Sequence, residues 1–189
     1  MTAKDIVRKV EGIVEDACKR ESNAFGYGIW SHHIVYVVKY SKKLAEKIGA
    51  DEEIVELASL LHDYASIKDF KCYKDHHIYG GQEAEKILKD LDYPTNRIEK
   101  IKGCILSHRA SIDSDRLSKE EVCVASGDAM AHIDQVVSLL YYVYKEKNMD
   151  IDEGKEWVRN KVMRSWNKLN KEGKELIEEK YYSVLKILE

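Results

Sequence analysis

The sequence predicts an all-α protein, and three observations lead to this prediction. The 189 residues include one proline, Pro94, and only 10 glycines. Lys, Glu, Ala, Leu and Ile are plentiful, and these residues favour long uninterrupted helices over turn-rich sheet. Apolar residues recur at steps of three and four along most of the chain, which is the period of amphipathic helices. Since a chain of this length is rather short for two domains, we expect a single helical bundle over residues 1–189.

The first three expected helices have clear limits. Apolar residues from Ile6 to Ala17 predict a first helix, which fades in the segment SNAFGYG. The run HIVYVVKYSKKLAEKI predicts a second helix, which starts near Trp30 and ends at Gly49, a residue type common just after helix ends. Asp51 is a suitable N-cap for the third helix, EEIVELASLLHD. The second and third helices should pack as an antiparallel pair.

The helical pattern continues through the middle and the C-terminal part of the chain. After the loop ASIKDFKCYKD, the segment HHIYGGQEAEKILKDL predicts a helix, and Pro94 suits the first turn of the next one. Ser118 opens a capping box, SKEE, for a long helix that we expect to run past Tyr144. Two more helices follow. Because no histidine lies beyond His132, we expect residues 136–189 to act as scaffold.

Charge and composition exclude several kinds of protein. Lys plus Arg (31) nearly balance Asp plus Glu (34), so no large basic field exists to hold a nucleic-acid polymer. The four cysteines form no CxxC pair, which suits free thiols in a reducing cytosol. The start of the chain lacks the apolar core of a signal peptide, and stretches such as VSLLYYVY are too short to span a bilayer. We therefore expect a soluble cytoplasmic protein without a membrane partner.

Histidines and aspartates gather in the first two thirds of the chain. They share positions at or near helix ends or on helix faces of one bundle: His32, His33, His62, His76, His77, His108, His132, Asp63 and Asp128. Imidazole and carboxylate groups offer nitrogen and oxygen ligands that suit divalent Mn, Fe, Co, Ni or Zn. The adjacent His62 and Asp63 point about 100° apart on a regular helix, so they share an ion only if it lies over the groove between them.

Five motifs occur in order along the chain: His33, His62-Asp63, His77, His108 and Asp128. Together with the flanking segments HIVYVVKYSKKLA, LASLLHDYA, HHIYGGQEAEKIL and VASGDAMAHI, they resemble the HD-domain superfamily of metal-dependent phosphohydrolases. The signature of that superfamily is H, HD, H, H, D on an all-α fold. The resemblance covers about residues 25–135, which we take as the motif core of an HD-type bundle.

The resemblance implies a metal site and a reaction. The first ion would have four ligands: His33, His62, Asp63 and Asp128. A second would use His77 and His108, with Asp63 as the bridging carboxylate. The cofactor is then one or two divalent ions (Mn, Fe, Co, Ni, Zn or Mg), which clamp an in-line displacement at phosphorus and lower the pKa of a bridging water. The implied activity is hydrolysis of a small phosphorylated metabolite or nucleotide, with Asp63 and His62 as the catalytic pair.

Departures from the patterns of particular branches leave the substrate open. Ser66 stands three positions beyond Asp63, where a branch resembling the deoxynucleotide monophosphatases carries an acidic residue. The HDYA flank resembles the branch that cleaves diadenosine polyphosphates, but Ser66 replaces its expected lysine and SHRAS replaces its usual fourth motif. No GYP signature supports a cyclic dinucleotide, and no long basic insertion supports a deoxynucleoside triphosphate.

Two choices among neighbouring residues depend on local context. His76 competes with His77 as a ligand, and the position of Gly80 three residues after His77 favours His77. The pair His62-Asp63, taken alone, would also suit a polar helix terminus.

Other residues have a functional and an ordinary interpretation. Asp128 lies in an apolar helix and needs a cation or several donors, whereas His132, one turn further, suits the core. Lys68 and Arg109 flank the expected ligands and could bind substrate phosphate, or could be solvated surface charges. The bulky aromatic groups are expected in the core or at a dimer surface: Tyr141, Tyr142, Tyr144, Trp157 and Trp166.

Two further functions would use the same ligands. One is a non-catalytic sensor that binds a metal and a nucleotide or phosphate and reports it to a partner. The other is an iron-dependent oxygenase on the same helical scaffold. The full set of motif residues favours the enzyme, because a binding module has no need of a second ion that activates water. The oligomeric state stays open, with a homodimer as one option.

Overall fold

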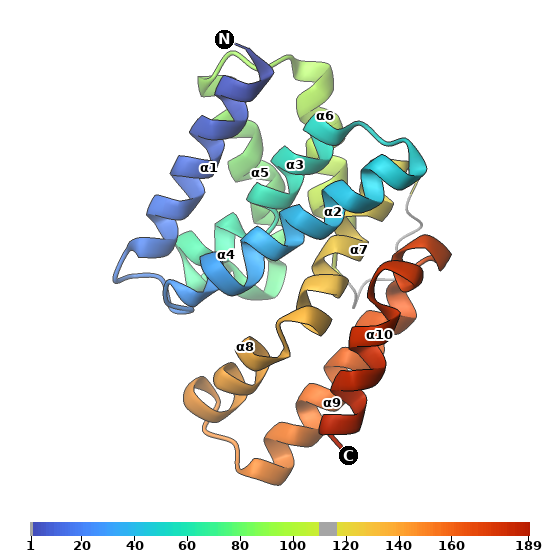
Figure 1. The fold of residues 1–189 in the computed structure, drawn as a ribbon. Coiled ribbons are helices and arrows are strands. Elements are labelled where there is room, and N and C mark those ends of the chain that lie inside the picture. The colour runs from blue at the N-terminus through green and yellow to red at the C-terminus, as the bar shows by residue number, and fades with distance from the viewer. Residues whose placement is uncertain (1, 110–116) are drawn as a thin grey trace.

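Helices make up the fold throughout residues 2–109 and 117–189, the part of the chain that the computed structural model describes, and no strand occurs there (Figure 1). The expected all-α fold is thus confirmed. The elements, in chain order, are α1 (Ala3–Lys19), η1 (Trp30–Ile34), α2 (Val35–Ile48), α3 (Glu52–Leu61), α4 (Tyr64–Lys68), η2 (Phe70–Asp75), α5 (His76–Asp90), α6 (Thr95–Ser107), α7 (Lys119–Asp134), α8 (Val136–Tyr141), η3 (Tyr142–Glu146), α9 (Ile151–Lys168) and α10 (Lys171–Ile187).

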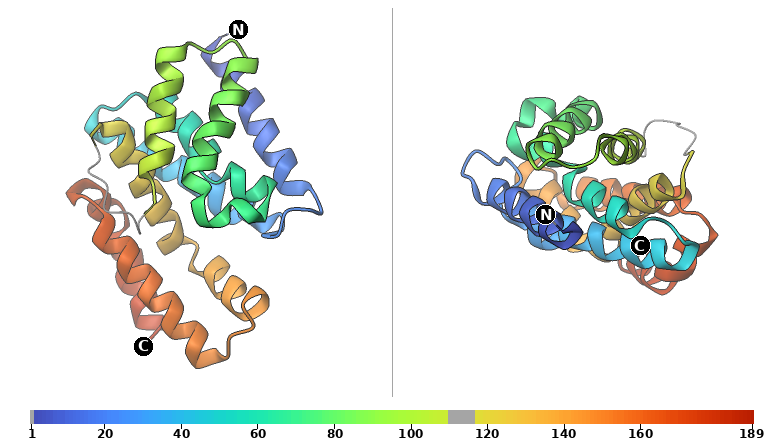
Figure 2. Two further views of the ribbon diagram at one scale, coloured as in Figure 1. Left: turned by 180° about the vertical axis from the view of Figure 1, so that it is seen from behind. Right: turned by 90° about the horizontal axis from the view of Figure 1, so that it is seen from above.

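Two groups of helices share α7 as their connection. We call α1–α7 the N-terminal bundle and α8–α10, with η3, the C-terminal helices. In Figures 1 and 2, α7 runs from the interior of the N-terminal bundle towards α8, while α9 and α10 lie side by side as an antiparallel pair along α7. Buried apolar residues form one cluster that extends from Ile6 in α1 to Leu188 after α10. No helix of the described residues is both long enough and apolar enough to cross a membrane.

Local signals set the limits of the early helices as expected. Asp51 caps α3, because its carboxylate accepts a hydrogen bond from the Ile54 backbone N–H at 3.2 Å. Gly49 ends α2 with φ 69°, a left-handed conformation that glycine adopts without strain. At the other end of α2, η1 has the wider turn of a π-helix, a geometry that is common at functional sites. His33 lies in this turn.

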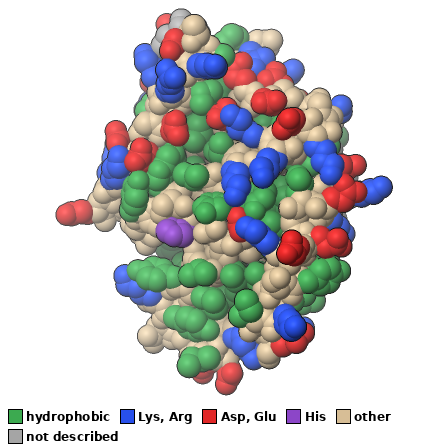
Figure 3. Space-filling view, in the orientation of Figure 1, with side chains coloured by type: hydrophobic (Ala, Val, Ile, Leu, Met, Phe, Trp, Pro, Cys, Tyr) green, Lys and Arg blue, Asp and Glu red, His purple; other side chains and the backbone are tan. Residues whose placement is uncertain are grey.

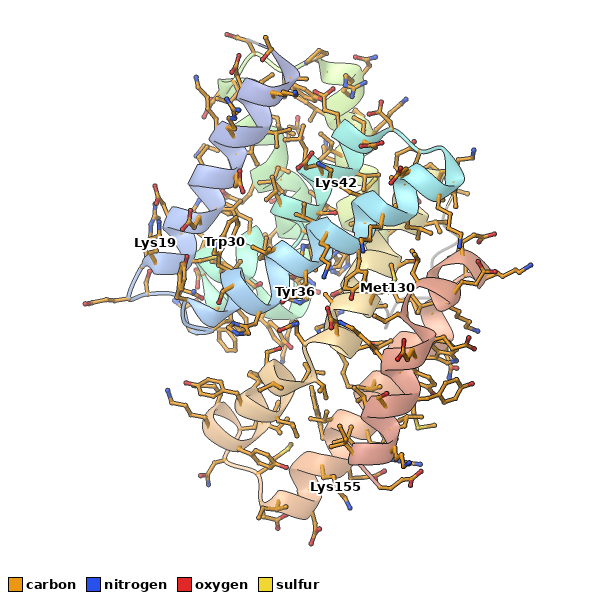
Figure 4. The ribbon with its side chains drawn as sticks, in the orientation of Figure 1. Lys19, Trp30, Tyr36, Lys42, Met130 and Lys155 are labelled. Carbon is orange, nitrogen blue, oxygen red and sulfur yellow. The ribbon has the colours of Figure 1, made fainter. Side chains whose placement is uncertain are left out.

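Helices α2 and α7 approach each other closely at Gly127. A Cβ atom on Gly127 would lie 1.9 Å from the Ser41 hydroxyl oxygen and 2.9 Å from the Val37 carbonyl oxygen, so only glycine allows this distance between the helix axes. Figure 4 shows Met130, which is fully buried, on the same helix near the centre of the molecule. The α2–α7 contact therefore positions Asp128, the residue after Gly127, against the helix that follows His33.

The long helix expected to run past Tyr144 is interrupted. It ends at Asp134, and the backbone turns at Gln135 with φ −105° and ψ 41° before α8 begins. Asp134 is held by two partners, the Tyr40 hydroxyl at 2.8 Å and the Lys180 ammonium group. The break redirects α8 away from the axis of α7, and a cavity lies between the N-terminal bundle and the C-terminal helices.

Candidate metal centre

Asp63 occupies the centre of a cluster of imidazole rings. It follows α3 and precedes α4, with φ −106° and ψ 2°, a sparsely populated backbone region in which active-site residues are often found. Its Oδ2 atom lies 3.4 Å from His33 Nε2 and 3.3 Å from His62 Nε2. Its Oδ1 atom lies 3.4 Å from His76 Nε2 and 4.0 Å from His108 Nε2. One carboxylate thus faces two separate pairs of histidines.

Backbone carbonyl groups orient three of these rings. The Nδ1 atoms of His62, His76 and His108 lie 2.8, 2.8 and 2.5 Å from the carbonyl oxygens three residues earlier in the chain. An N–H at Nδ1 donates to each carbonyl, which leaves the lone pair of Nε2 directed at the cluster. Metal-binding histidines in proteins are held in this way by their second ring nitrogen. The local helix ends therefore place three nitrogen ligands ready for a cation.

Asp128 approaches the cluster from α7, on the side of His33. Its Oδ1 lies 3.6 Å from His33 Nε2 and 3.2 Å from His132 Nε2, one turn further along α7. Its Oδ2 accepts a hydrogen bond from the Lys168 ammonium group at 3.1 Å. The rings of His33 and His132 are stacked with centroids 4.8 Å apart. Asp128 is thus shared between the histidine cluster and the end of α9.

The charges of the metal-free cluster are strongly coupled. Burial would raise the pKa of Asp63, but the adjacent His62 and His33 hold it well below its ordinary value. Burial would also lower the pKa of His62, yet Asp63 and Asp128 raise it to about 9. The pKa of His108 falls to about 3, first through burial and then through repulsion from His62. The two carboxylates thus favour positive charge in the cluster, and a proton on His62 supplies it when no ion is bound.

The donor set fits divalent cations. Three groups of residues bring one ligand atom each to within 4.8 Å of one another: His33-His62-Asp63, Asp63-His76-His108 and His33-Asp128-His132. The nitrogen and oxygen atoms are 3.0–3.6 Å apart in most of these pairs. Ligands at about 2.0–2.2 Å from one ion are separated by roughly 3.0–3.5 Å from each other. Two converging nitrogen lone pairs, such as those of His76 and His108 at 3.0 Å, also need a proton or an ion between them.

The structure places His76, rather than the predicted His77, beside Asp63 and His108. Among the described residues, His76 belongs to a ligand group and His77 does not, although His77 is buried and its Nδ1 has no hydrogen-bond partner. The reason lies in Gly80, on which the choice depended. A Cβ on Gly80 would lie 3.0 Å from the Ile105 side chain and 3.2 Å from the His62 carbonyl oxygen, so Gly80 allows close packing of α5. His76, four residues before Gly80, shares this face more closely than His77.

The remaining predicted residues divide into two groups. His33, His62, Asp63 and His108 come together as expected, and Asp128 joins them through His33; their role as ligands stays a prediction. Arg109 lines the cavity beside the cluster and donates a hydrogen bond to the Lys74 carbonyl group. Lys68 lies elsewhere, in an ion pair with Glu83 at 2.8 Å at a separate small hollow. Its assignment to substrate binding is therefore not supported by its position.

A cavity of about 700 Å³ opens onto the cluster. Figure 3 shows the hollow between the upper and lower parts of the molecule, with hydrophobic side chains gathered below it. Residues from the C-terminal helices form one wall: Leu139, Tyr142, Trp157, Lys161 and Arg164. We had expected these helices to act as scaffold. The spacing of Trp157, Lys161 and Arg164 at i, i+4 and i+7 places them on one face of α9, which lines the cavity.

Comparisons with known proteins agree with this geometry. The family model described as HD domain matches residues 30–133. Ribonuclease Y of Petrotoga mobilis is 27% identical over 99 residues, which are 52% of this chain and 17% of that protein. The chain thus spans less than a fifth of the length of this curated relative.

Solved structures share the fold over nearly the whole chain. A protein from Listeria innocua is 21% identical and has a TM-score of 0.75, with 100% of this chain and 94% of that chain covered. A HD-superfamily hydrolase from Bacillus thuringiensis has a TM-score of 0.70 at 16% identity, with 99% and 95% covered. A predicted HD superfamily hydrolase from an uncultured Thermotogales bacterium has a TM-score of 0.62 at 18% identity, with 96% and 88% covered. At these identities the likeness concerns the fold.

Proposed function

We propose, because this chain belongs to the HD-domain family, that it is a phosphohydrolase acting on a small phosphorylated metabolite or nucleotide. The HD-superfamily hydrolase fold supports a metal-dependent hydrolase. The observation that carries the finer proposal is the position of Asp63, whose two oxygen atoms face two pairs of histidines. A carboxylate in this position is suited to bridge two divalent ions.

The residues of the cluster would form two metal sites. His33 and His62 would hold one ion with Asp63, and His76 and His108 would hold the other. Bound divalent ions would supply Lewis-acid polarisation of a phosphoryl oxygen and a water of lowered pKa. Arg109, at the edge of the cluster, would bind phosphate oxygens through charge-assisted hydrogen bonds.

The cavity supports a small substrate. Its volume of about 700 Å³ lies within the range of sites for small molecules and cofactors. Since acidic and basic residues nearly balance, we do not propose a nucleic-acid polymer as substrate. The similarity to a protein named ribonuclease Y makes a short RNA oligomer a useful member of the substrate panel. A cytoplasmic location remains part of the proposal.

Metal analysis of the purified protein, together with a panel of phosphomonoesters and phosphodiesters, tests the proposal. We expect one or two divalent ions per chain and hydrolysis that a chelator abolishes. Binding of phosphate compounds without turnover would instead indicate a sensor. Oxygen uptake after iron loading, without hydrolysis, would indicate an oxygenase.

The variant Asp63→Ala is the sharpest single change. It should reduce turnover by several orders of magnitude and lower the metal content, because the bridging carboxylate is lost. The fold should persist, since the Asp63 side chain makes no capping hydrogen bond to α4. Asp90→Ala, at an exposed position on α5, is the matched control. Retained metal combined with a lower melting temperature would contradict the proposal and indicate a structural aspartate.

A further inference from the structure

The face of α9 that lines the cavity changes in character along its length. Trp157 lies at one end, followed by Lys161 and Arg164 at successive turns, and then by Lys168 beside Asp128. These residues stand at i, i+4, i+7 and i+11, so all four lie on one side of the helix. Along this side of α9, an aromatic ring is therefore followed by two cations and then by the lysine that contacts a candidate metal ligand.

The two middle cations, Lys161 and Arg164, line the cavity. Neither Lys161 nor Arg164 forms an ion pair with any residue in the described part of the chain. Lys161 is half-buried, and its charge acts on the cluster, since burial first and Lys161 second lower the pKa of His132 to about 3. Burial would raise the pKa of Asp128, but Lys161 also helps to lower it, after Lys168 and His132. A half-buried cation that lines a cavity and forms no ion pair within the described residues is suited to bind an anion.

The charge of the cavity lining also favours an anionic ligand. Apart from the cluster itself, the described lining residues include three cations, Arg109, Lys161 and Arg164, and one carboxylate, Glu146. Phosphate is the anion that a metal-dependent phosphohydrolase would bring into this cavity. Arg109 lies near the Lys168 end of this face of α9, because Lys168 donates a hydrogen bond to the carbonyl group of His108, the residue before Arg109. Phosphate groups along this face of α9 could therefore be bound by the three cations.

Aromatic rings also line the cavity. Trp157 and Tyr142 have ring centroids 6.2 Å apart on the C-terminal wall. Across the cavity, Phe25 and Tyr73 have centroids 5.9 Å apart, and Tyr73 stacks on His76 at 6.1 Å. Flat aromatic walls suit a planar heterocycle, because each base stacked on a protein ring contributes about 1–3 kcal/mol of binding free energy.

We propose that this face of α9 is a nucleotide-binding subsite, in which Lys161 and Arg164 bind phosphate and Trp157, with Tyr142, stacks against the base. The inference rests on the proposed function in one respect, namely that the phosphate next to the metal cluster is the group that reacts. It narrows the substrate class from phosphorylated metabolites in general to nucleotides. It also assigns substrate recognition to helices that lie outside the matched HD domain, residues 30–133.

Calorimetric titration of the full-length, metal-containing protein tests the subsite with three probes. Adenosine 5′-(α,β-methylene)diphosphate carries base and phosphates, methylenediphosphonate lacks the base, and adenosine lacks the phosphates. The double variant Lys161→Gln/Arg164→Gln should lose about 10-fold or more in affinity for both phosphonate probes and bind adenosine unchanged. Trp157→Leu should lose about 10-fold for both adenosine probes and bind methylenediphosphonate unchanged.

Arg159→Gln is the matched control, because it removes a cation from α9 at a position that is not among the described lining residues. It should bind all three probes as the unchanged protein does. Metal content and the far-ultraviolet circular dichroism spectrum are measured for every variant. They distinguish a variant that no longer binds the probe from one that no longer folds. Tyr142→Leu provides a second test of the stacking surface if Trp157→Leu does not fold.

The outcomes separate this inference from the proposed function. If the variants show the expected pattern but no phosphate ester is hydrolysed, the subsite stands and the catalytic proposal fails. If the protein hydrolyses phosphate esters and the double variant binds every probe normally, the subsite is overturned and the catalytic proposal stands. Equal affinity for the base-containing and base-free phosphonates, unaffected by Trp157→Leu, would overturn the assignment to nucleotides.

Discussion

The N-terminal bundle and the C-terminal helices contribute to the same cavity with different chemistry. The N-terminal bundle supplies every histidine of the chain, at positions 32 to 132, and both aspartates of the cluster. The C-terminal helices supply cations and aromatic rings, Lys161, Arg164, Trp157 and Tyr142, to the facing wall. A metal centre needs a few residue types, here histidine and aspartate, at fixed positions. Binding of a substrate can use lysine, arginine and aromatic side chains, which are common on the surface of any helix.

A buried ion pair connects the N-terminal bundle and the C-terminal helices, and its removal should have the largest effect on stability. Lys168, at the end of α9, donates to Asp128 at 3.1 Å and to the His108 carbonyl group, and its side chain is 5% exposed. Lys168→Met should cost about 3 kcal/mol of stability in the metal-free protein, because Asp128 keeps a buried charge without this partner. Thermal unfolding should show a melting temperature lower by roughly 6–12 °C.

Metal should reduce the effect of this substitution, because an ion close to Asp128 compensates the same charge. Unfolding of Lys168→Met is therefore measured with and without added Mn²⁺ or Zn²⁺. Lys155→Met, which removes an exposed hydrogen bond from the same helix to the Glu189 backbone oxygen, is the control and should leave stability within about 0.5 kcal/mol. Equal stability of Lys168→Met and Lys155→Met would show that the two parts are energetically independent at this point.

Within the N-terminal bundle, neighbouring histidines offer a second test. His76→Ala should lower the affinity for the second ion by roughly 100-fold, since it removes a nitrogen ligand beside Asp63. His77→Ala should leave metal affinity unchanged, because His77 lies outside the ligand groups of the described residues. Competition with a metal-binding dye measures both. The reverse order of effects would restore the original choice of His77.

The α2–α7 contact tests how far the metal centre depends on helix packing. Gly127→Ala should destabilise the protein by about 1–3 kcal/mol, because the added methyl group meets the Ser41 side chain and the Val37 carbonyl oxygen. Gly12→Ala, where no atom lies within 4 Å of the added Cβ, should instead stabilise α1 by about 0.4–1 kcal/mol. Denaturant unfolding distinguishes them, and similar values for both variants would contradict the close approach of α2 and α7.

The helices and the histidine cluster could be predicted from the sequence because their signals are local. Helical spacing and the Asp51 cap lie within short segments, and each histidine motif is identified by its own flanking residues. The choice between His76 and His77 could not be made, because it depends on how α5 packs on α6 around Gly80. The end of α7 at Asp134 depends on Tyr40 and Lys180, which are distant in the chain.

The position of the α9 face in the cavity could not be predicted for a related reason. Trp157 and the cations that follow it have the composition of an ordinary amphipathic helix, and such a helix packs its aromatic residues in the core in most proteins. This face of α9 lines the cavity, and the chain turns at Gln135, between α7 and α8, before it reaches α9. The function of these side chains is thus set by the path of the chain between α7 and α9, which carries no motif.

The smallest predicted effect compares two helix caps, one in each part of the molecule. Asp51 caps α3 and forms hydrogen bonds to the Arg97 guanidinium at 2.9 and 3.0 Å. Burial would raise the pKa of Asp51, but Arg97 and the Ile54 N–H lower it below the ordinary value. Because the folded-state pKa is the lower one, this stabilisation is present above about pH 4 and is lost as pH falls through the folded-state pKa.

Asp51→Asn keeps a good N-cap and removes the charge. We expect it to be less stable than the unchanged protein by under about 1 kcal/mol at pH 7, as is usual for a partly exposed ion pair, and by nothing measurable once Asp51 is protonated. Asp150 caps α9 in the same way, accepting from the Glu153 N–H at 2.8 Å, and has no ion pair among the described residues. Asp150→Asn should therefore show a smaller dependence on pH in urea unfolding at pH 7, 5 and 3. If both variants lose stability in the same way as the pH falls, the Asp51–Arg97 ion pair contributes nothing to the free energy of unfolding. The effect of acid on α3 and α9 would then come only from protonation of the two N-cap aspartates.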